Sequence, residues 1–173
     1  MGKAYVGLGS NLSDRWEHLR LARMRLNALP RTALVGFSRV YETSPVGPVE
    51  QDAYLNAVAE LETELGPAEL MPHFARIEEE AGRPLEGQRV KWGPRTLDLD
   101  LLLYDDQVVS SDELVVPHPL LHDRWFVLQP LVDLNPALIH PLIQMTVSDL
   151  LANLEDAPAA TREGFGREVT CEP

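Results

Sequence analysis

The chain has 173 residues, of which 45% are apolar and 24% charged, a balance typical of one globular domain with a hydrophobic core. Its net charge of −12 disfavours binding to nucleic acid, and no apolar run approaches the roughly 18 residues of a membrane span. The start of the chain is a poor signal peptide and the only cysteine, Cys171, cannot form an internal disulfide, so we expect a cytoplasmic protein.

Positive charge is unevenly distributed along the chain. Five of the fifteen Lys and Arg residues fall within twenty positions: Arg76, Arg83, Arg89, Lys91 and Arg95. Such a cluster on an acidic protein suits a small anionic ligand, although the same residues could equally form a solvated helix face and loop.

The first third of the chain alternates between strand and helix patterns. Lys3 to Gly9 alternates in the manner of a strand. A helix follows, with Ser13 as its expected N-cap and Pro30 marking its end. Thr32 to Thr43 and Tyr54 to Thr63 predict the second and third strands, separated by a loop rich in proline.

A second helix and a fourth strand complete this pattern. The helix should open at Gly66 and end at Gly82, a favourable C-terminal cap, while Pro72 predicts an irregular first turn. Thr96 to Tyr104 is the fourth strand. The order β-α-β-β-α-β predicts an α+β fold, a ferredoxin-like sandwich in which two helices pack on one face of an antiparallel sheet.

Shorter elements should come after the fourth strand. We predict a strand pair around Val108 and Leu114 to Val116, a helix from about Leu121 to Asp133, and a last helix capped by Thr146. Apolar periodicity vanishes from Glu155 onward.

This change of pattern sets the expected domain boundary. We predict one domain over residues 1–154 and a mobile tail over residues 155–173. No internal repeat and no long linker is visible in the sequence.

Two carboxylates interrupt the leucine-rich fourth strand, in the stretch KWGPRTLDLDLLLY. Because side chains alternate between the faces of a strand, its odd-numbered leucines should share the core face. These are Leu97, Leu99, Leu101 and Leu103. Asp98 and Asp100 then lie side by side on the other face, where like charges repel unless water or a cation relieves them. The spacing suits Mg²⁺ that bridges to a phosphate, with a merely solvated face as the alternative.

The neighbouring residues favour a phosphate site. Trp92, Gly93 and Pro94 lead directly into Arg95, whose guanidinium fork fits phosphate oxygens. His118 and Arg124 could add further phosphate donors, although His118 taken alone is more typical of a structural turn. The chain has no P-loop motif, no complete dinucleotide fingerprint and no zinc spacing.

Five segments resemble, in the expected order, the 6-hydroxymethyl-7,8-dihydropterin pyrophosphokinase family, over about Ala4 to Leu150. They are GLGSNL, TSPVGPVEQDAYLNA, RIEEEAGR, WGPRTLDLDLLLY and VPHPLLHDRWFVLQPL. The resemblance implies an enzyme of folate biosynthesis that transfers pyrophosphate from ATP to the pterin hydroxymethyl oxygen and releases AMP. It also implies the ferredoxin-like α/β sandwich.

The resemblance further implies a role for each matching residue. Asp98 and Asp100 match ligands of two Mg²⁺ ions and, with Arg83 and Arg95, form the catalytic set. The residues that match nucleotide contacts are Glu78, Trp92, Arg95, Leu101, His118 and Arg124. The residues that match pterin contacts are Thr43, Pro45, Val46, Tyr54, Asn56 and Phe126. The implied partners are the pterin and ATP, with no nucleic acid and no membrane, and we expect a monomer.

Other functions remain to be weighed against this one. Tyr54 and Phe126 could be ordinary core aromatics, whereas an amide such as Asn56 among apolar strand residues needs partners. A non-catalytic ferredoxin-like ligand module would explain the element order but not the aspartates beside Trp-Gly-Pro-Arg. A nucleotidyl-transferring or cyclase-like enzyme would also use paired carboxylates, but Asn56 and the two aromatics favour a flat heterocyclic acceptor.

Overall fold

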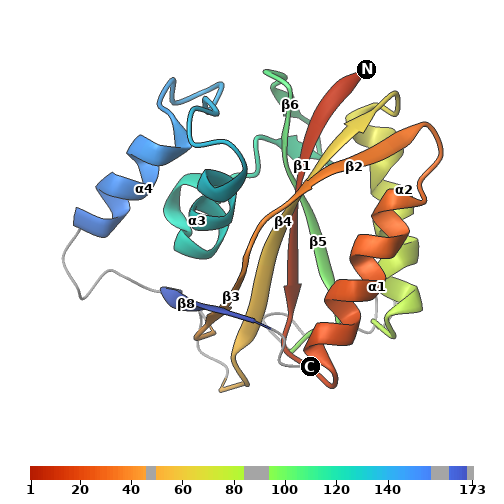
Figure 1. The fold of residues 1–173 in the computed structure, drawn as a ribbon. Helices are drawn as coiled ribbons and strands as arrows, with labels where there is room; N and C mark the ends of the chain where they lie inside the picture. Colours follow the sequence, from red (N-terminus) through yellow and green to blue (C-terminus); the bar gives the residue numbers. More distant parts are fainter. Residues whose placement is uncertain (46–49, 84–93, 157–163, 171–173) are drawn as a thin grey trace.

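The computed structural model describes residues 1–45, 50–83, 94–156 and 164–170, which form three layers (Figure 1). A six-stranded sheet lies in the middle, with helices α1 and α2 on one side and α3 and α4 on the other. The helices are α1 (Arg15–Asn27), α2 (Pro67–Glu80), α3 (Trp125–Leu134) and α4 (Val147–Asp156). The strands are β1 (Gly2–Ser10), β2 (Thr32–Phe37), β3 (Val40–Thr43), β4 (Tyr54–Thr63), β5 (Asp98–Tyr104), β6 (Val109–Ser110), β7 (Val115–Val116) and β8 (Gly166–Val169).

The sheet is antiparallel throughout its described pairs, with the order β5-β1-β4-β3-β8 and with β2 also pairing with β4. In this register Gly9 of β1 lies opposite both Asn56 of β4 and Asp98 of β5. Three segments that are far apart in the sequence therefore meet at one end of the sheet. The predicted α+β class is confirmed, and α3 and α4 cover the face that the first two helices leave open.

The expected single strand over residues 32–43 is divided into β2 and β3 at Ser38. The Ser38 N–H donates to the Val58 carbonyl at 2.9 Å, and the Ser38 hydroxyl accepts the Val58 N–H at 2.8 Å. A side-chain oxygen thus replaces the strand carbonyl, so the backbone can bend without leaving the Val58 donor unpaired.

The alternation of leucines along β5 holds for only part of the strand. Leu99 and Leu101 face α1 and α2, as expected, but Leu103 packs with Leu102 on the face toward α3. The register shifts between Tyr5 and Val6, which pair with Leu103 and Leu101. A bulge at this point adds one residue to β5 and reverses the facing of the residues beyond it, so the prediction for Leu103 was wrong.

The start of α1 differs from expectation by one residue. Asp14 is the N-cap, because its carboxylate accepts the Glu17 N–H at 3.0 Å. Ser13, the residue expected there, has φ of +56° and precedes the cap. A carboxylate at this position also interacts favourably with the positive end of the helix dipole.

The end of α2 follows the predicted chemistry. The Gly82 N–H donates to the Glu79 carbonyl at 2.9 Å, and the Arg83 N–H donates to the Glu78 carbonyl at 3.0 Å. Gly82 has φ of +81°, which glycine adopts without strain. Pro72 lies inside the helix, which continues through it without the irregular turn that we expected. These two hydrogen bonds end α2 and place Arg83 directly after its glycine cap.

The C-terminal third contains one element that the sequence did not predict. The β6–β7 pair and the Thr146 cap of α4 are present, with the Asp149 N–H 3.0 Å from the Thr146 hydroxyl. The helix expected over residues 121–133 is a 3₁₀ turn (Leu121–Asp123) followed by α3. Within the region expected to be a mobile tail, β8 pairs with β3.

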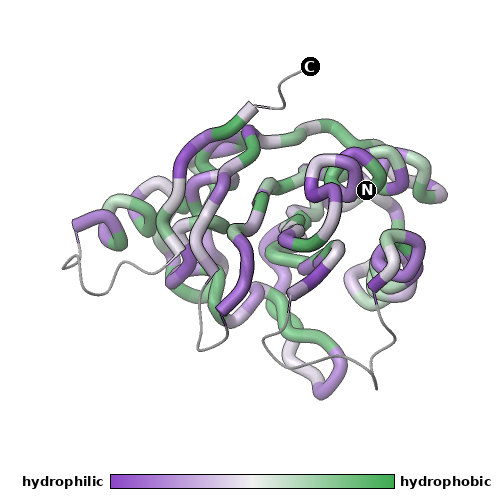
Figure 2. Tube along the Cα trace, turned by 90° about the horizontal axis from the view of Figure 1, so that it is seen from below, coloured by the Kyte–Doolittle hydropathy of each residue, from purple (hydrophilic) through white to green (hydrophobic). Residues whose placement is uncertain are grey.

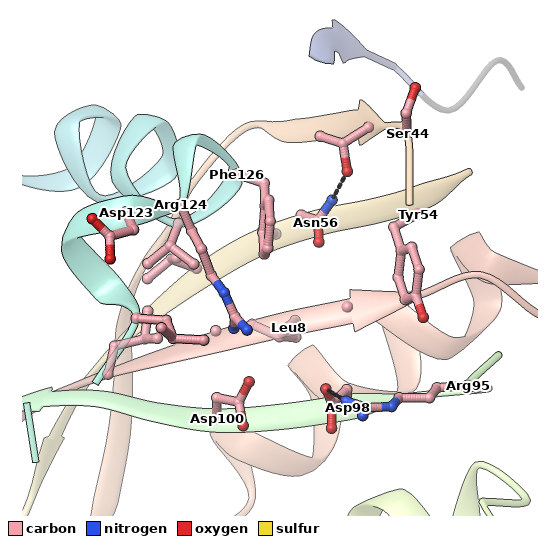
Figure 3. A pocket seen from close by; sticks show the side chains of 18 of the residues that line it. Leu8, Ser44, Tyr54, Asn56, Arg95, Asp98, Asp100, Asp123, Arg124 and Phe126 are labelled. Atoms are coloured by element: carbon pink, nitrogen blue, oxygen red, sulfur yellow. Dashed lines mark hydrogen bonds and ion pairs between the residues drawn. The ribbon is translucent and has the colours of Figure 1, made fainter. Parts of the chain in front are cut away.

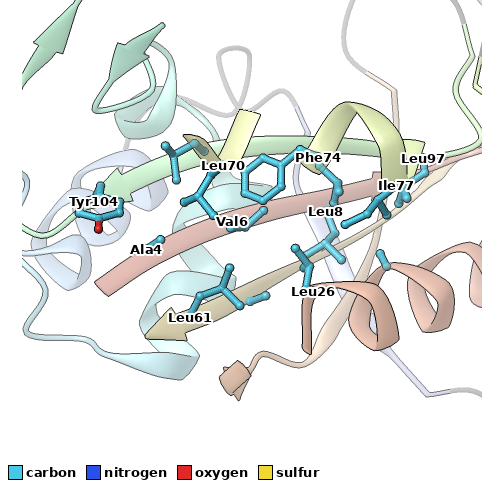
Figure 4. Packing of buried hydrophobic residues seen from close by; sticks show 14 of the residues in the cluster. Ala4, Val6, Leu8, Leu26, Leu61, Leu70, Phe74, Ile77, Leu97 and Tyr104 are labelled. Atoms are coloured by element: carbon cyan, nitrogen blue, oxygen red, sulfur yellow. The ribbon is translucent and has the colours of Figure 1, made fainter. Parts of the chain in front are cut away.

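Apolar side chains fill both spaces between the layers. One cluster joins the sheet to α1 and α2 through Val6, Leu26, Leu70 and Phe74 (Figure 4). The other joins it to α3 and α4 through residues such as Leu128 and Leu131. Hydrophobic and hydrophilic residues interleave along the chain (Figure 2), and each of the four helices contributes buried side chains to one of the two clusters. None of the helices in the described ranges is long and apolar enough to cross a membrane.

Replacement of Leu70 by Ala should strongly destabilise the fold. Leu70 is fully buried between α2 and the sheet, so Leu70→Ala should lower the free energy of unfolding by about 2–5 kcal/mol. Met24→Ala, at a largely exposed position of α1, should change it by less than about 0.5 kcal/mol. Urea denaturation followed by circular dichroism measures both, and equal effects would contradict the burial of Leu70.

Candidate active site

Two cavities meet at the carboxylate-bearing end of β5. The first, of about 570 Å³, lies between the sheet and the start of α3 (Figure 3). Its lining includes Thr43, Tyr54, Asn56, Arg95, Asp98, Asp100, Arg124 and Phe126. The second, of about 740 Å³, lies between α2, β5 and the β6–β7 region. Its lining includes Glu78, Arg83, Arg95, Asp98 and Asp100. Three charged residues are shared, so the aspartates stand at the boundary between the two spaces.

The two aspartates lie side by side on β5, as strand alternation predicts. Their neighbours on β1 are Gly9 beside Asp98 and Gly7 beside Asp100. A Cβ on Gly9 would come within 3.6 Å of the Asn56 side-chain oxygen, so the absence of a side chain there keeps the cavity floor open. Burial, followed by the charge of Asp98, raises the pKa of Asp100 to about 7.

Arg83 and Arg95 provide positive charge beside this pair. Arg83 lies 2.6 Å from an Asp98 carboxylate oxygen, and Arg95 forms an ion pair with the other oxygen. The Arg83 side chain is only 8% exposed, which excludes the alternative of a solvated arginine. Its position is set by the hydrogen bonds that Gly82 and Arg83 make to the last turn of α2 and by the positive φ of Gly82.

Glu78 connects the end of α2 to β5. Its buried carboxylate accepts the Leu99 N–H at 2.8 Å and forms an ion pair with Arg83. Leu99 lies on β5 between the two aspartates, on a strand that has β1 on one side only in the described sheet. Glu78 therefore satisfies an edge donor and holds Arg83 near the aspartates with the same carboxylate.

His118 and Arg124 approach from the segment that precedes α3. The His118 N–H donates to the Leu102 carbonyl at 2.9 Å, which fixes this segment against β5. Burial, followed by the charge of Arg124, lowers the pKa of His118 to about 4. Burial lowers the pKa of Arg124 despite the charges of Asp100 and Asp98. Arg124 also lies over the ring of Phe126, 5.6 Å from its centroid.

The residues assigned to the heterocycle cluster in the first cavity. The Asn56 side-chain N–H donates to the Thr43 hydroxyl at 2.7 Å, and both residues are buried. Asn56 points into the space between Tyr54 and Phe126 (Figure 3). One polar side chain with a fixed orientation is thus flanked by two aromatic rings, an arrangement suited to a flat, polar-edged molecule.

Five of the predicted site residues do not line either cavity among the described residues or lie outside the described ranges. Leu101 is buried in the core shared with α1 and α2 and, like half-buried Pro45, is not among the described residues that line the two cavities. Val46 and Trp92 lie outside the residues that the structure describes. His118 lies beside the first cavity and does not line it in the described region.

The sequence reasoning did not identify the role of Asn11 and Gln51. Buried Asn11 accepts the Arg95 N–H at 2.7 Å and donates to the Gln51 side-chain oxygen at 3.0 Å and to the Asp52 carbonyl at 3.1 Å. The Tyr54 hydroxyl donates to the same Gln51 oxygen at 3.2 Å. Asn11 thus joins the Arg95 segment to the segment before β4. Its position in the GLGSNL motif was the available signal.

Comparison with known proteins identifies one family. The model of the 7,8-dihydro-6-hydroxymethylpterin-pyrophosphokinase family matches residues 5–136. A 2-amino-4-hydroxy-6-hydroxymethyldihydropteridine pyrophosphokinase of Haemophilus influenzae is 40% identical over 153 residues, which cover 88% of this chain and 93% of that protein. The Bacillus subtilis protein of the same name is 43% identical over 131 residues, covering 76% and 77%.

Solved structures share the fold at much lower identity. The structure of the A437G variant of Plasmodium falciparum HPPK-DHPS with pteroate superposes with a TM-score of 0.68 at 14% identity, over 88% of this chain. The matched region is 43% of that longer protein, so the present chain spans less than half of its length. This likeness concerns the fold alone.

The pKa of His118 is directly testable. Its Nδ1 accepts the Leu120 N–H at 3.2 Å, so the proton of the neutral ring should reside on Nε2. We expect an NMR titration midpoint of about 4 in the folded protein and the ordinary value of about 6.5 in urea. Because the folded pKa is the lower one, this histidine should cost stability as the pH falls below about 6.5. A folded midpoint near 6.5 would contradict the described burial.

Proposed function

Because the chain belongs to the 7,8-dihydro-6-hydroxymethylpterin-pyrophosphokinase family, we propose that it transfers pyrophosphate from ATP to 6-hydroxymethyl-7,8-dihydropterin in folate biosynthesis, releasing AMP. The observation that carries the proposal is the position of Asp98 and Asp100 at the boundary of two cavities. Transfer between two substrates requires a place where both are reached by the same charge-neutralising groups.

Each cavity suits one of the two substrates. The first cavity, with Asn56 between Tyr54 and Phe126, would bind the pterin through its polar edge and its flat faces. Thr43 would orient the Asn56 amide through their mutual hydrogen bond. The second cavity, between α2 and the β6–β7 region, would receive the nucleotide. Its phosphates would then lie toward Arg83, Arg95 and the aspartates.

The aspartate pair fits magnesium. The raised pKa of Asp100 indicates a carboxylate whose charge is poorly neutralised by the protein itself. No cluster of three or more potential protein ligands occurs among the described residues. This agrees with Mg²⁺, which is commonly held by one or two carboxylates together with substrate phosphates and water. We propose two ions at Asp98 and Asp100, which would neutralise phosphate charge and lower the pKa of the pterin hydroxyl.

The chain's own residues would position the phosphates and stabilise charge that develops on them. Arg83 and Arg95 already lie at Asp98 and both line the second cavity, so they could bind phosphate oxygens as the charge moves to the AMP leaving group. Neutral His118 would donate a hydrogen bond from Nε2 to a phosphate oxygen. Arg124, which lines the first cavity, would bind the phosphates from the pterin side. Pro45, Val46 and Trp92 would close the site, and Glu78, which lines the second cavity, would support the nucleotide.

We also propose finer structural assignments. The order β5-β1-β4 followed by β2 and β3 supports a ferredoxin-like topology. We propose a monomeric, cytoplasmic protein in which residues 1–154 carry the substrate-binding and catalytic side chains. The family membership disfavours a non-catalytic ligand module and a cyclase-like enzyme, because the relatives are named as pyrophosphokinases.

The nucleotide formed from ATP, either AMP or ADP, tests the reaction class. With ATP, Mg²⁺ and the reduced pterin alcohol, the chain should form AMP and the pterin diphosphate in equal amounts. Anion-exchange chromatography with phosphorus NMR identifies both products, and omission of the pterin should suppress AMP. Formation of ADP would sink the pyrophosphoryl assignment.

Removal of one carboxylate tests the metal site. Asp100→Ala should lower metal-dependent turnover at least about 100-fold, because an ion at this position would lose one of its protein ligands. Asp106→Ala, which removes an exposed carboxylate just beyond β5, should leave turnover within about twofold. Turnover at saturating Mg²⁺ and calorimetric binding of Mg-ATP are the measurements. Full activity of the Asp100 variant would show that the carboxylate pair is dispensable.

A further inference from the structure

The strand β8 joins the sheet next to the proposed heterocycle cavity. It pairs antiparallel with β3 in a register that places Gly166 opposite Thr43 and Arg167 opposite Glu42 (Figure 1). Thr43 lines the first cavity and accepts the hydrogen bond from Asn56. The residues of β8 lie beyond the segment 5–136 that matches the family, so the family match assigns them no role.

Gly166 permits an unusually close approach of the two strands. A Cβ at this position would lie 2.1 Å from the Glu42 carbonyl oxygen and 2.6 Å from the Thr43 methyl carbon. No side chain fits there unless β8 moves away from β3. The glycine backbone therefore packs directly against the Thr43 methyl group. Because χ1 of a β-branched residue is restricted, a fixed methyl also fixes the direction of the Thr43 hydroxyl toward Asn56.

The residue before β8 contacts the opposite wall of the same cavity. The Phe165 ring stacks on Trp125, with ring centroids 5.4 Å apart and an angle of 26° between the planes. Trp125 is the first residue of α3, and its neighbours Arg124 and Phe126 line the cavity. Trp125 also makes an edge contact with Tyr41 of β3. Two adjacent residues, Phe165 and Gly166, thus connect the wall formed by α3 to the wall formed by β3.

Ion pairs accompany this register of β8 at the edge of the sheet. Glu42 binds Arg167 at 3.3 Å and Arg15 at 2.9 Å, and Glu168 binds Arg39 at 2.9 Å. Arg15 also donates to the Ala53 carbonyl at 2.7 Å, directly before β4. The pairing of β8 is therefore connected to the ends of both β3 and β4, which carry Thr43 and Asn56.

We propose that the segment Phe165–Val169 is a positioning element for the pterin: it sets the spacing of the β3 and α3 walls and the orientation of the Thr43–Asn56 pair. This inference rests on the proposed function for the identity of the ligand. It predicts that a disturbance of β8 weakens pterin recognition while leaving the nucleotide cavity, which lies on the far side of the aspartates, unaffected.

The test uses Gly166→Ala in the full chain, with Gly66→Ala as the matched control. A Cβ on Gly66 has room, since its nearest neighbour is the Glu69 carboxylate at 3.4 Å. Gly166→Ala should raise the KM for the pterin about tenfold, because sub-ångström to ångström misplacement of binding groups has effects of this order or more. The KM of Gly166→Ala for ATP should stay within about twofold of the wild-type value. Gly66→Ala should keep both its KM for the pterin and its KM for ATP within the same range.

A second pair of variants separates positioning from simple loss of stability. Phe165→Ala should raise the KM for the pterin by a similar factor, and Phe165→Tyr, which preserves the stacking, should restore it. The thermal unfolding midpoint is measured for every variant. Two results would overturn the proposal. One is an unchanged KM for the pterin in both Gly166→Ala and Phe165→Ala. The other is an equal rise in the KM for the pterin and the KM for ATP, together with a lower unfolding midpoint.

The same experiment distinguishes failure of the inference from failure of the proposed function. If the wild-type chain forms AMP but Gly166→Ala and Phe165→Ala both keep a normal KM for the pterin, the positioning role alone is overturned. Wild-type chain that neither forms AMP nor binds the pterin by equilibrium fluorescence overturns the proposed function and the inference with it.

Discussion

The structure depends on one electrostatic constraint, the placement of two carboxylates side by side at the edge of a core strand. Strand periodicity directs Asp98 and Asp100 to one face while Leu97 and Leu99 anchor the other face in the core. Burial makes Asp100 difficult to ionise next to Asp98, which is reflected in its raised pKa. Such a pair is favourable only where positive charge is available, and the surrounding elements supply it.

The residue that holds a cation near the aspartates also satisfies a backbone donor at the edge of the sheet. β5 has β1 on one side, and Glu78 of α2 accepts the Leu99 N–H on the other. The same carboxylate binds Arg83, which follows the glycine cap of α2 and also forms an ion pair with Asp98. A change at Glu78 would therefore affect both the stability of an edge strand and the position of a cation. At Glu78 the same side chain therefore supports both the fold and the site.

The cavities on either side of the aspartates are lined by segments that lie far apart in the sequence. Asn11 connects the Arg95 segment with Gln51, and His118 fixes the segment before α3 to β5. The first cavity thus has walls from β1, β3, β4, β5 and α3, and each wall is fixed by hydrogen bonds to another. Walls fixed in this way suit a flat substrate, whose orientation must be set before its hydroxyl can accept the pyrophosphoryl group.

The candidate site could be predicted residue by residue where the motif itself carried the chemistry. Asp98, Asp100, Arg95 and Asn56 fall together as expected. Asn11 was missed because its importance lies in three partners from distant segments: the GLGSNL motif marks the residue but does not identify these partners. The positions of Val46 and Trp92 lie outside the described residues, so their assignments stay predictions.

The sequence by itself determined the features that depend on local periodicity and capping. These are the order of elements from β1 to β5, the shared face of the aspartates, the end of α2 at Gly82 and the cap of α4 at Thr146. Only the tertiary structure decided the division at Ser38, the turned facing of Leu103, the burial of Arg83 and the addition of β8. Each of these is fixed by a partner far away in the chain, and local side-chain patterns contain no information about such partners.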